Sequence, residues 1–308
     1  MSHFLHASSW SKLWRYLYPH HQQCISCAHT IIGLSVYEGL CHACASRIPW
    51  IMKPQCRVCG RSIHCEDCQR QVMQHRGFLL NRSAVRYNTD IRSWLAAYKY
   101  RGNERYEAVF GQLMVEGYYR LQAELSTHFG CEWFPAWITS VPASTNRLQE
   151  RGFDQAAQMA RWLAADIKLP YLPLLERTRQ TMKQSEQGRQ ERIRSMAGVF
   201  SYSTMAGSLV HDVLQRHHEP YGYRNRISSY IAAPAVPMQA SSLQTNQSLR
   251  VSGQLEDERN ANRVIPILLI DDIYTTGSTI HNCALALHEL GAQCRVQFQV
   301  ISLTCARS

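Results

Sequence analysis

ILLIDDIYTTGST, at residues 267–279, is the stretch that says most about the fold. A short apolar run ends there in two carboxylates, Asp271 and Asp272, and small hydroxylated residues follow around Gly277. A continuous apolar run of this length is typical of a central strand in a parallel sheet, where both faces are buried. Open α/β sheets bind their ligands at the carboxyl ends of such strands. The stretch therefore predicts a ligand site at the end of a central parallel strand.

The same stretch indicates the chemistry of the ligand. Its two carboxylates can accept hydrogen bonds from vicinal ribose hydroxyls. The loop that follows offers a phosphate its backbone N–H groups, its hydroxyls and the start of a helix. The loop residues are Thr275, Thr276, Gly277, Ser278 and Thr279. A ribose 5-phosphate satisfies both halves of the motif.

Two other interpretations of the stretch exist. The acidic pair could hold magnesium in a nucleoside triphosphatase, but that class needs a phosphate loop in which lysine follows glycine. None of the 16 glycines is followed by lysine, which argues against this class. The stretch could also be a buried strand that ends in a solvated turn without a ligand.

Helices and strands alternate along the rest of the chain. Apolar spacing predicts helices over 91–98, 106–113, 155–167 and 279–290, the last ending at Gly291, and strands over 133–141, 264–270 and 295–303. This alternation predicts an α/β fold with a mostly parallel sheet.

Eight of the 12 cysteines lie between residues 24 and 68, in four Cys-x-x-Cys pairs. Two such pairs complete a tetrahedral all-thiolate site, the usual arrangement for structural zinc. If neighbouring pairs combine in sequence order, the cysteines predict one or two Zn²⁺ sites. A crossed combination of the pairs, a disulfide framework and an iron–sulfur cluster remain alternatives. The eight predicted ligands are Cys24, Cys27, Cys41, Cys44, Cys56, Cys59, Cys65 and Cys68.

Composition bounds the class of protein. The chain has 308 residues, 45% of them hydrophobic, and a formal net charge of +10. Its longest apolar run, Val264–Ile270, is far shorter than the roughly 20 residues of a membrane span. No secretory signal is evident at the N-terminus, so we expect a cytoplasmic protein without a membrane span. The basic charge favours nucleic acid or phosphate-bearing small molecules as partners.

Changes in composition predict three parts of the chain. Residues 1–20 form an N-terminal tail, residues 21–75 a metal-binding module, and residues 76–308 an α/β domain. Residues 201–262 are rich in Ser, Gln, Asn and Pro, and we expect them to form a flexible insertion, part of which could be helical.

The motif at 267–279 resembles the 5-phosphoribosyl-1-pyrophosphate (PRPP) signature of type I phosphoribosyltransferases. Other segments narrow the resemblance to the ComF/GntX family: VPAS at 141–144 with Arg147 and RGFDQ at 151–155, KYRG at 99–102, and the pattern between Arg177 and Phe200. The N-terminal cysteine pairs also fit this family. Asp154 stands where the family usually has asparagine, and Ser195 stands near the position of another expected asparagine.

The resemblance implies a cytoplasmic competence protein of natural transformation and DNA uptake. It implies a type I phosphoribosyltransferase-like, mostly parallel sheet joined to a zinc-ribbon-like module. PRPP binding and pentosyl transfer from PRPP are separate claims, so enzymatic activity as a phosphoribosyltransferase stays open.

The resemblance also implies roles for individual residues. Asp271 and Asp272 would hold the ribose hydroxyls, and the loop 275–279 would hold the 5-phosphate. The segment with Val141, Ala143 and Ser144 would face pyrophosphate, accompanied by Mg²⁺. Arg147 and Arg151 would be catalytic by neutralising the charge that develops on pyrophosphate.

An alternative hypothesis makes the protein a non-catalytic adaptor. The zinc module and the basic surface would then contact single-stranded DNA, a DNA-uptake helicase or a recombination protein, and the PRPP pocket would be regulatory or vestigial. A steep salt dependence of DNA binding would favour this hypothesis.

Overall fold

The computed structural model describes residues 23–33, 35–63, 65, 68, 76–100, 105–178, 198–216 and 264–308. The predicted tail 1–20 and residues 217–262 of the predicted insertion lie outside the described residues. So do Arg189, Arg192 and Ser195 of the family pattern.

Within the described ranges, four parallel strands form the main sheet in the order β1-β6-β5-β2. Their bounds are β1 Asn81–Arg86, β2 Trp137–Ser140, β5 Val264–Tyr274 and β6 Gln297–Arg307. The apolar run before the acidic pair lies in β5, which is central and pairs with β2 and β6. The α/β class with a mostly parallel sheet is therefore confirmed.

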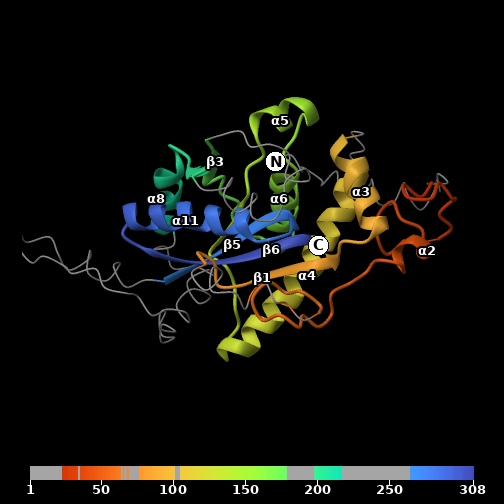
Figure 1. Ribbon diagram of the computed structural model, residues 1–308, viewed down its shortest axis with the longest axis horizontal. Coiled ribbons are helices and arrows are strands. Elements are labelled where there is room, and N and C mark those ends of the chain that lie inside the picture. Colours follow the sequence, from red (N-terminus) through yellow and green to blue (C-terminus); the bar gives the residue numbers. More distant parts are fainter. Residues whose placement is uncertain are drawn as a thin grey trace, which may run out of the picture.

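Helices cover both faces of this sheet (Figure 1). The described helices are α2 His42–Ala45, α3 Thr89–Tyr100, α4 Arg105–Phe129, α5 Thr145–Arg151, α6 Gln155–Ile167, α8 Ala206–Arg216 and α11 Ser278–Gln293. A short antiparallel pair, β3 Leu175–Arg177 with β4 Phe200–Tyr202, lies beside the sheet. Among these described helices, none combines the length and the apolar character that crossing a membrane requires.

Alternate residues of β5 separate two hydrophobic cores in the described part of the chain. Leu268 and Ile270 pack with residues of α3, α4 and α6 in the first core. Ile267 and Leu269 pack with residues of α11 and α8 in the second core. Both faces of β5 are thus buried, as its apolar run predicts. Its carboxyl end lies between the two helical layers.

The structure corrects the expected end of the last helix. The helix α11 does not stop at Gly291 but continues to Gln293. A side chain at position 291 would come within 2.8 Å of the carbonyl oxygen of Val296. The glycine therefore allows a close approach to the chain that leads into β6, rather than ending the helix.

Two further elements differ from the predicted pattern. The sequence does not predict the strand β1, because its residues NRSAVR lack an apolar run. The first part of the predicted insertion contributes residues 201 and 202 to β4, whereas the helix α8, which buries Val210, agrees with the expectation that part of it is helical. By contrast, α6 has the predicted bounds, Gln155–Ile167.

Candidate functional site

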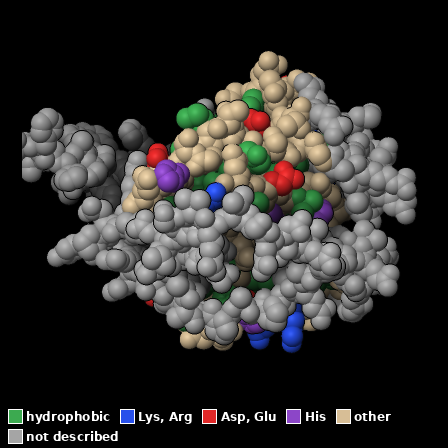
Figure 2. Space-filling view, turned by 90° about the vertical axis from the view of Figure 1, so that its left-hand side faces the viewer, with side chains coloured by type: hydrophobic (Ala, Val, Ile, Leu, Met, Phe, Trp, Pro, Cys, Tyr) green, Lys and Arg blue, Asp and Glu red, His purple; other side chains and the backbone are tan. Residues whose placement is uncertain are grey.

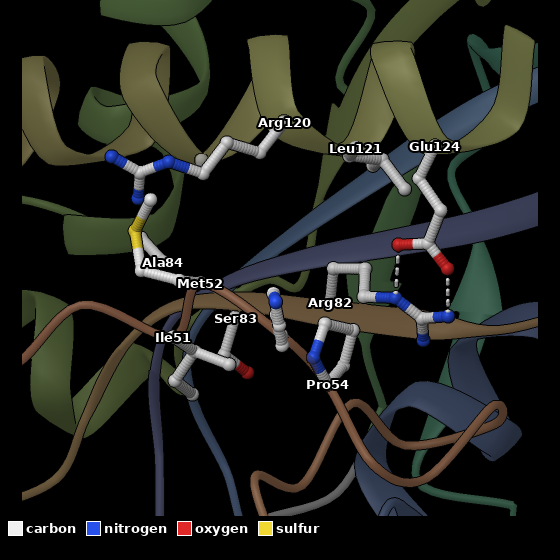
Figure 3. Close-up of a pocket in the computed structure, with 11 residues that line it drawn as sticks. Ile51, Met52, Pro54, Arg82, Ser83, Ala84, Arg120, Leu121 and Glu124 are labelled. Atoms are coloured by element: carbon white, nitrogen blue, oxygen red, sulfur yellow. Dashed lines mark hydrogen bonds and ion pairs between the residues drawn. The ribbon is translucent and has the colours of Figure 1, made fainter. Parts of the chain in front are cut away.

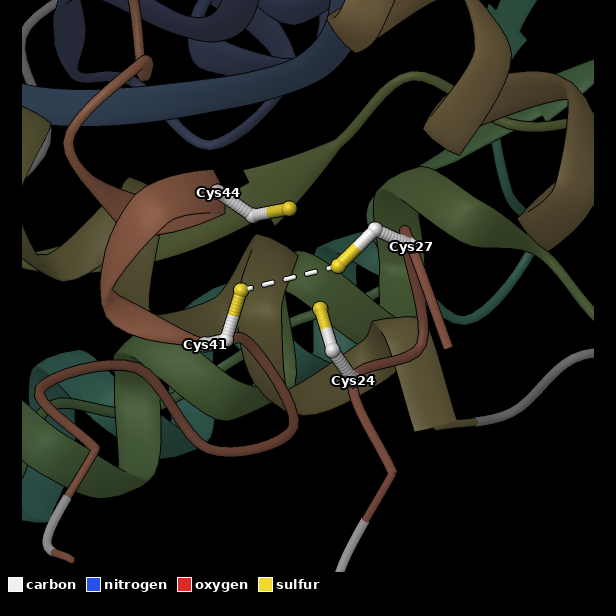
Figure 4. Close-up of side chains that lie close together, drawn as sticks. All are labelled: Cys24, Cys27, Cys41 and Cys44. Atoms are coloured by element: carbon white, nitrogen blue, oxygen red, sulfur yellow. Dashed lines mark hydrogen bonds between the residues drawn. The ribbon is translucent and has the colours of Figure 1, made fainter. Parts of the chain in front are cut away.

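The cysteine pairs form two four-thiol clusters within the described residues. In each cluster, all sulfur atoms lie within 4.8 Å of one another. Cys24, Cys27, Cys41 and Cys44 converge on one centre, as Figure 4 shows, and Cys56, Cys59, Cys65 and Cys68 converge on another. This arrangement confirms sequential pairing and contradicts the crossed alternative. All 12 cysteines are free thiols, so the disulfide framework is not formed.

The donor set fits a structural metal ion. A hydrogen bond from the Cys68 thiol lowers the pKa of Cys59, and burial raises it. The charge of Arg307 also lowers this pKa, which comes to about 4. In the other cluster burial also opposes ionisation, but backbone N–H groups, foremost that of Cys41, lower the pKa of Cys24 to about 6. Each cluster thus stabilises a thiolate, the form of cysteine that binds metal.

The two clusters lie on opposite faces of the sheet. Cys24 and Cys44 belong to the core with α3 and α4, whereas Cys59 and Cys65 belong to the core with α11. In Figure 1 the segment that carries α2 lies next to α3. Between the clusters the chain runs antiparallel along β1, and the N–H of Ile51 donates to the carbonyl of Ala84 at 3.1 Å.

A cavity of about 620 Å³ lies at the carboxyl ends of β2 and β5. It brings together the acidic stretch and the VPAS segment, which are far apart in the sequence. Predicted residues that line it are Val141, Ala143, Ser144, Arg147, Arg151, Asp271, Asp272, Thr275 and Thr279. Thr276, Gly277 and Ser278 belong to the same loop but are not among the lining residues.

The lining also contains charged residues outside the predicted set. Arg92, Lys99 and Arg177 join Arg147 and Arg151, so that, among the described residues, five basic side chains face one cavity. The resemblance of the KYRG segment already suggests Lys99 as an auxiliary residue, and Arg177 lies in a segment that carries the same resemblance. No pattern in the sequence singles out Arg92.

Asp154 fixes the segment at 141–144. One carboxylate oxygen accepts from the N–H of Ala143 at 2.7 Å, and the other accepts from the N–H of Ala157 at 3.0 Å. The second bond caps the start of α6. Aspartate at position 154, where the family usually has asparagine, therefore keeps an acceptor that caps the helix and adds a negative charge to the wall of the cavity.

Arg151 is held in place by three contacts. It donates to Gln155 Oε1 at 2.7 Å and to the Tyr100 hydroxyl at 3.1 Å, and its guanidinium lies 4.8 Å from the Tyr100 ring centroid. These contacts preorganise a cation at the cavity wall. Arg147 lies one turn earlier on α5 and is half-buried there.

The carboxylate pair has a partly buried lysine as its partner. Lys99 of α3 forms an ion pair with Asp272, and the N–H of Asp272 donates to Asp271 Oδ1 at 2.8 Å. Burial raises the pKa of Asp271 to about 7, against the charge of Lys99. Burial and the charge of Arg151 lower the pKa of Lys99 to about 8. A buried acid and a partly buried base that both titrate near neutrality are typical of functional sites.

A second cavity of about 360 Å³ lies between residues 51–54, β1 and α4 (Figure 3). An ion pair between Arg82 and Glu124 lies at its wall, and Arg82 also donates to the carbonyl of Arg57 at 3.1 Å. None of the predicted site residues lines this cavity. Its geometry indicates a structural link between the second cluster segment, β1 and α4.

Comparisons with known proteins support one family. No family model matches the chain. Competence protein ComFC of Bacillus subtilis (strain 168) is 25% identical over 278 residues, which cover 88% of this chain and 85% of that protein. Competence protein ComFC of Streptococcus pneumoniae (strain ATCC BAA-255 / R6) is 24% identical over 284 residues, which cover 88% and 96%. These two matches cover almost the whole length of the chain, and they support its resemblance to the ComF/ComFC family.

Proposed function

We propose that this is a competence-related protein of DNA uptake whose α/β domain binds PRPP. The observation that carries the proposal is the cavity of about 620 Å³, because the acidic pair, Thr275 and Thr279 of the loop, the VPAS segment and two arginines all line it. The relatives are named competence proteins, which supports the biological role. We place it in the cytoplasm, with a metal module at 21–75 and the α/β domain at 76–308.

In this proposal each wall recognises one part of the ligand. Asp271 and Asp272 accept hydrogen bonds from the ribose hydroxyls, and residues 275–279 hold the 5-phosphate near the start of α11. Val141, Ala143 and Ser144 contact pyrophosphate. When bound there, Mg²⁺ would offset part of the pyrophosphate charge.

Pentosyl transfer would need one more step at the same site. The bond between the anomeric carbon and the pyrophosphate oxygen would break while an acceptor attacks that carbon. Arg147 and Arg151 line the cavity beside the proposed pyrophosphate segment, where they would neutralise the charge of the leaving group. Lys99 can rearrange from its ion pair with Asp272 when the ribose hydroxyls arrive.

Titration calorimetry tests the binding proposal. PRPP with Mg²⁺ would be titrated into the wild-type protein and into the double variant Asp271→Asn/Asp272→Asn. We expect micromolar binding that the double variant loses. Asp166→Asn serves as the control, because Asp166 is exposed on α6 away from the cavity lining. Absence of binding by folded, metal-loaded wild-type protein would contradict the proposal.

The adaptor hypothesis is the second candidate, favoured by the net charge of +10. Aromatic side chains beside basic residues could stack on bases in this hypothesis; Tyr98 and Tyr118 are buried, whereas Tyr100 and Tyr119 are exposed. On the face in Figure 2, the described residues show interspersed charged, histidine and hydrophobic side chains. A salt-dependent affinity for single-stranded DNA that persists in Asp271→Asn/Asp272→Asn would favour the adaptor.

We also propose that zinc is the ion of both clusters. Four thiolates form a closed tetrahedral set, which suits a structural Zn²⁺. Metal analysis of the purified protein should find two zinc ions per chain.

A further inference from the structure

The phosphate loop begins where two paired strands end. Tyr274 is the last residue of β5 and pairs with Arg307, the last residue of β6. Thr275, the first loop residue, follows directly. Whatever fixes Tyr274 therefore fixes the start of the loop 275–279.

Arg307 links this strand end to the second cysteine cluster. Its side chain is buried, and one terminal nitrogen donates to the carbonyl of Tyr274 at 3.2 Å and also to the carbonyl of Ser308. The other terminal nitrogen donates to the sulfur of Cys59 at 3.7 Å. The guanidinium also lies 4.8 Å from the centroid of the Tyr274 ring. One side chain thus contacts both a predicted metal ligand and the residue before the loop.

Tyr274 supports the loop on its buried side. Its ring is buried, and its hydroxyl lies so close to Gly277 that a side chain at 277 would come within 2.2 Å of it. Gly277 has a φ of 85° and precedes the first residue of α11. The loop therefore rests on the tyrosine, and only a glycine fits at the point of contact.

A second connection runs from the same cluster to α11. Arg76 donates to the carbonyl of Cys68 at 3.1 Å, and the neighbouring Gly77 donates its N–H to His281 Nδ1 at 3.1 Å. His288, two turns further along α11, contacts the carbonyl of Gly77 at 2.6 Å. The first cluster packs instead with α3 and α4 on the opposite face.

We propose that Arg307 and Tyr274 are positioning residues that transmit the metal occupancy of the second cluster to the phosphate loop. A hydrogen bond to a ligating sulfur orients its donor when the thiolate is held by metal. With the cluster empty, Cys59 is free to move, and Arg307 loses its anchor on the cluster side. The loop then samples more conformations and binds its ligand less tightly. The choice of ligand rests on the proposed function, whereas the link between cluster and loop does not.

Hydrogen exchange of the loop amides tests the link without any ligand. Cys56→Ser removes one ligand of the second cluster, and Cys41→Ser is the matched change in the first. Arg307→Met keeps both clusters but removes the side-chain hydrogen bonds of the arginine. We expect Cys56→Ser and Arg307→Met to speed exchange in residues 275–281 about tenfold, with Cys41→Ser close to wild type. Metal analysis should find two zinc ions in Arg307→Met.

The result that would overturn the proposal is unchanged exchange in Arg307→Met with both metal sites filled. Equal acceleration by Cys41→Ser and Cys56→Ser would also overturn it, since that outcome indicates general destabilisation. Circular dichroism first establishes that each variant is folded. If Cys41→Ser or Cys56→Ser does not fold, Arg307→Met alone decides the question.

Ligand binding supplies a reciprocal readout. Because coupling acts in both directions, the affinity for ribose 5-phosphate should fall about 5- to 150-fold in Cys56→Ser and in Arg307→Met. In Cys41→Ser loaded with cobalt at the second cluster, ribose 5-phosphate should shift the sulfur-to-cobalt absorption band. Adding Arg307→Met should abolish that shift. If wild type binds neither PRPP nor ribose 5-phosphate, the proposed function fails, while the exchange measurement still decides on the link.

Discussion

The two cysteine clusters have the same donor atoms but cover different surfaces. The first cluster lies on apolar material, where Leu40 and Ile48 join a hydrophobic core. The second lies over a buried polar network in which Asn81 donates to the carbonyl of Cys59 at 3.3 Å and accepts from Ser302 at 2.7 Å. Both clusters therefore join a hydrophobic core, but the second also contacts buried polar groups and strand ends near the ligand cavity.

Loss of stability should separate the clusters most clearly. Cys41 and Cys56 are both partly exposed, so serine at either position removes a ligand without opening a cavity in the core. We expect Cys41→Ser to lower the free energy of unfolding by about 4 kcal/mol and Cys56→Ser by about 2 kcal/mol. The reason is that loss of the first cluster frees Ser26 from Trp94, with which it forms a hydrogen bond of 2.9 Å, and exposes apolar surface.

Urea unfolding followed by tryptophan fluorescence measures this difference. Equal losses in the two variants would show that the clusters stabilise the fold in the same way. A larger loss in Cys56→Ser would reverse the comparison.

Local sequence patterns predict the secondary structure of this molecule better than they predict its long-range contacts. The bounds of α6 and the pairing of the cysteines follow from helical periodicity and short spacings. The strand β1 could not be predicted, because its polar side chains are satisfied by residues far away in sequence, such as Thr304, whose hydroxyl lies 2.6 Å from that of Ser83.

The candidate site shows the same division. The acidic pair and the loop 275–279 are evident from the sequence because they are contiguous. Lys99 lies in a segment that carries the family resemblance, but its burial against Asp272 depends on how α3 packs onto the sheet. The contact between Arg307 and Cys59 joins residues 248 positions apart, and no local pattern indicates it.

Two glycines allow the loop beside the second cluster to be compared with a turn away from it, at the end of α5. Gly277 and Gly152 both have positive φ values, 85° and 77°, so alanine is strained at either position. Only at 277 would the new side chain meet a neighbour, because nothing in the described structure lies within 4 Å at 152. We expect Gly277→Ala to cost about 2 kcal/mol more than Gly152→Ala in urea unfolding. Similar costs would mean that Tyr274 does not support the loop as tightly as the structure shows.

A weaker effect is expected where the two helical layers meet, at Asp271 and Lys99. Burial raises the pKa of Asp271 to about 7, so the folded protein keeps a proton that the unfolded chain releases above its ordinary pKa near 3.8. Stability from this group is therefore fully present below about pH 3.8 and is lost as the pH rises through 7. An asparagine at this position cannot ionise and avoids that loss, although the nearby charges of Lys99, Arg147 and Arg177 partly offset it in the wild type.

We accordingly expect the free energy of unfolding of Asp271→Asn, measured relative to wild type, to increase by about 1 kcal/mol from pH 6 to pH 8.5. The same variant should lose ribose 5-phosphate binding. Urea unfolding of both proteins at the two pH values gives this difference directly. The lowered pKa of Lys99 acts in the other sense, since it costs stability as the pH falls from about 10.5 to about 8. Because asparagine does not attract the charge of Lys99, the stability cost of burying this lysine is larger in the variant at low pH. The free energy of unfolding of the variant therefore increases more than that of wild type as the pH rises toward 8.5. Exposed Asp166→Asn should show no such pH dependence, and a gain of equal size there would assign the effect to net charge rather than to the buried carboxylate.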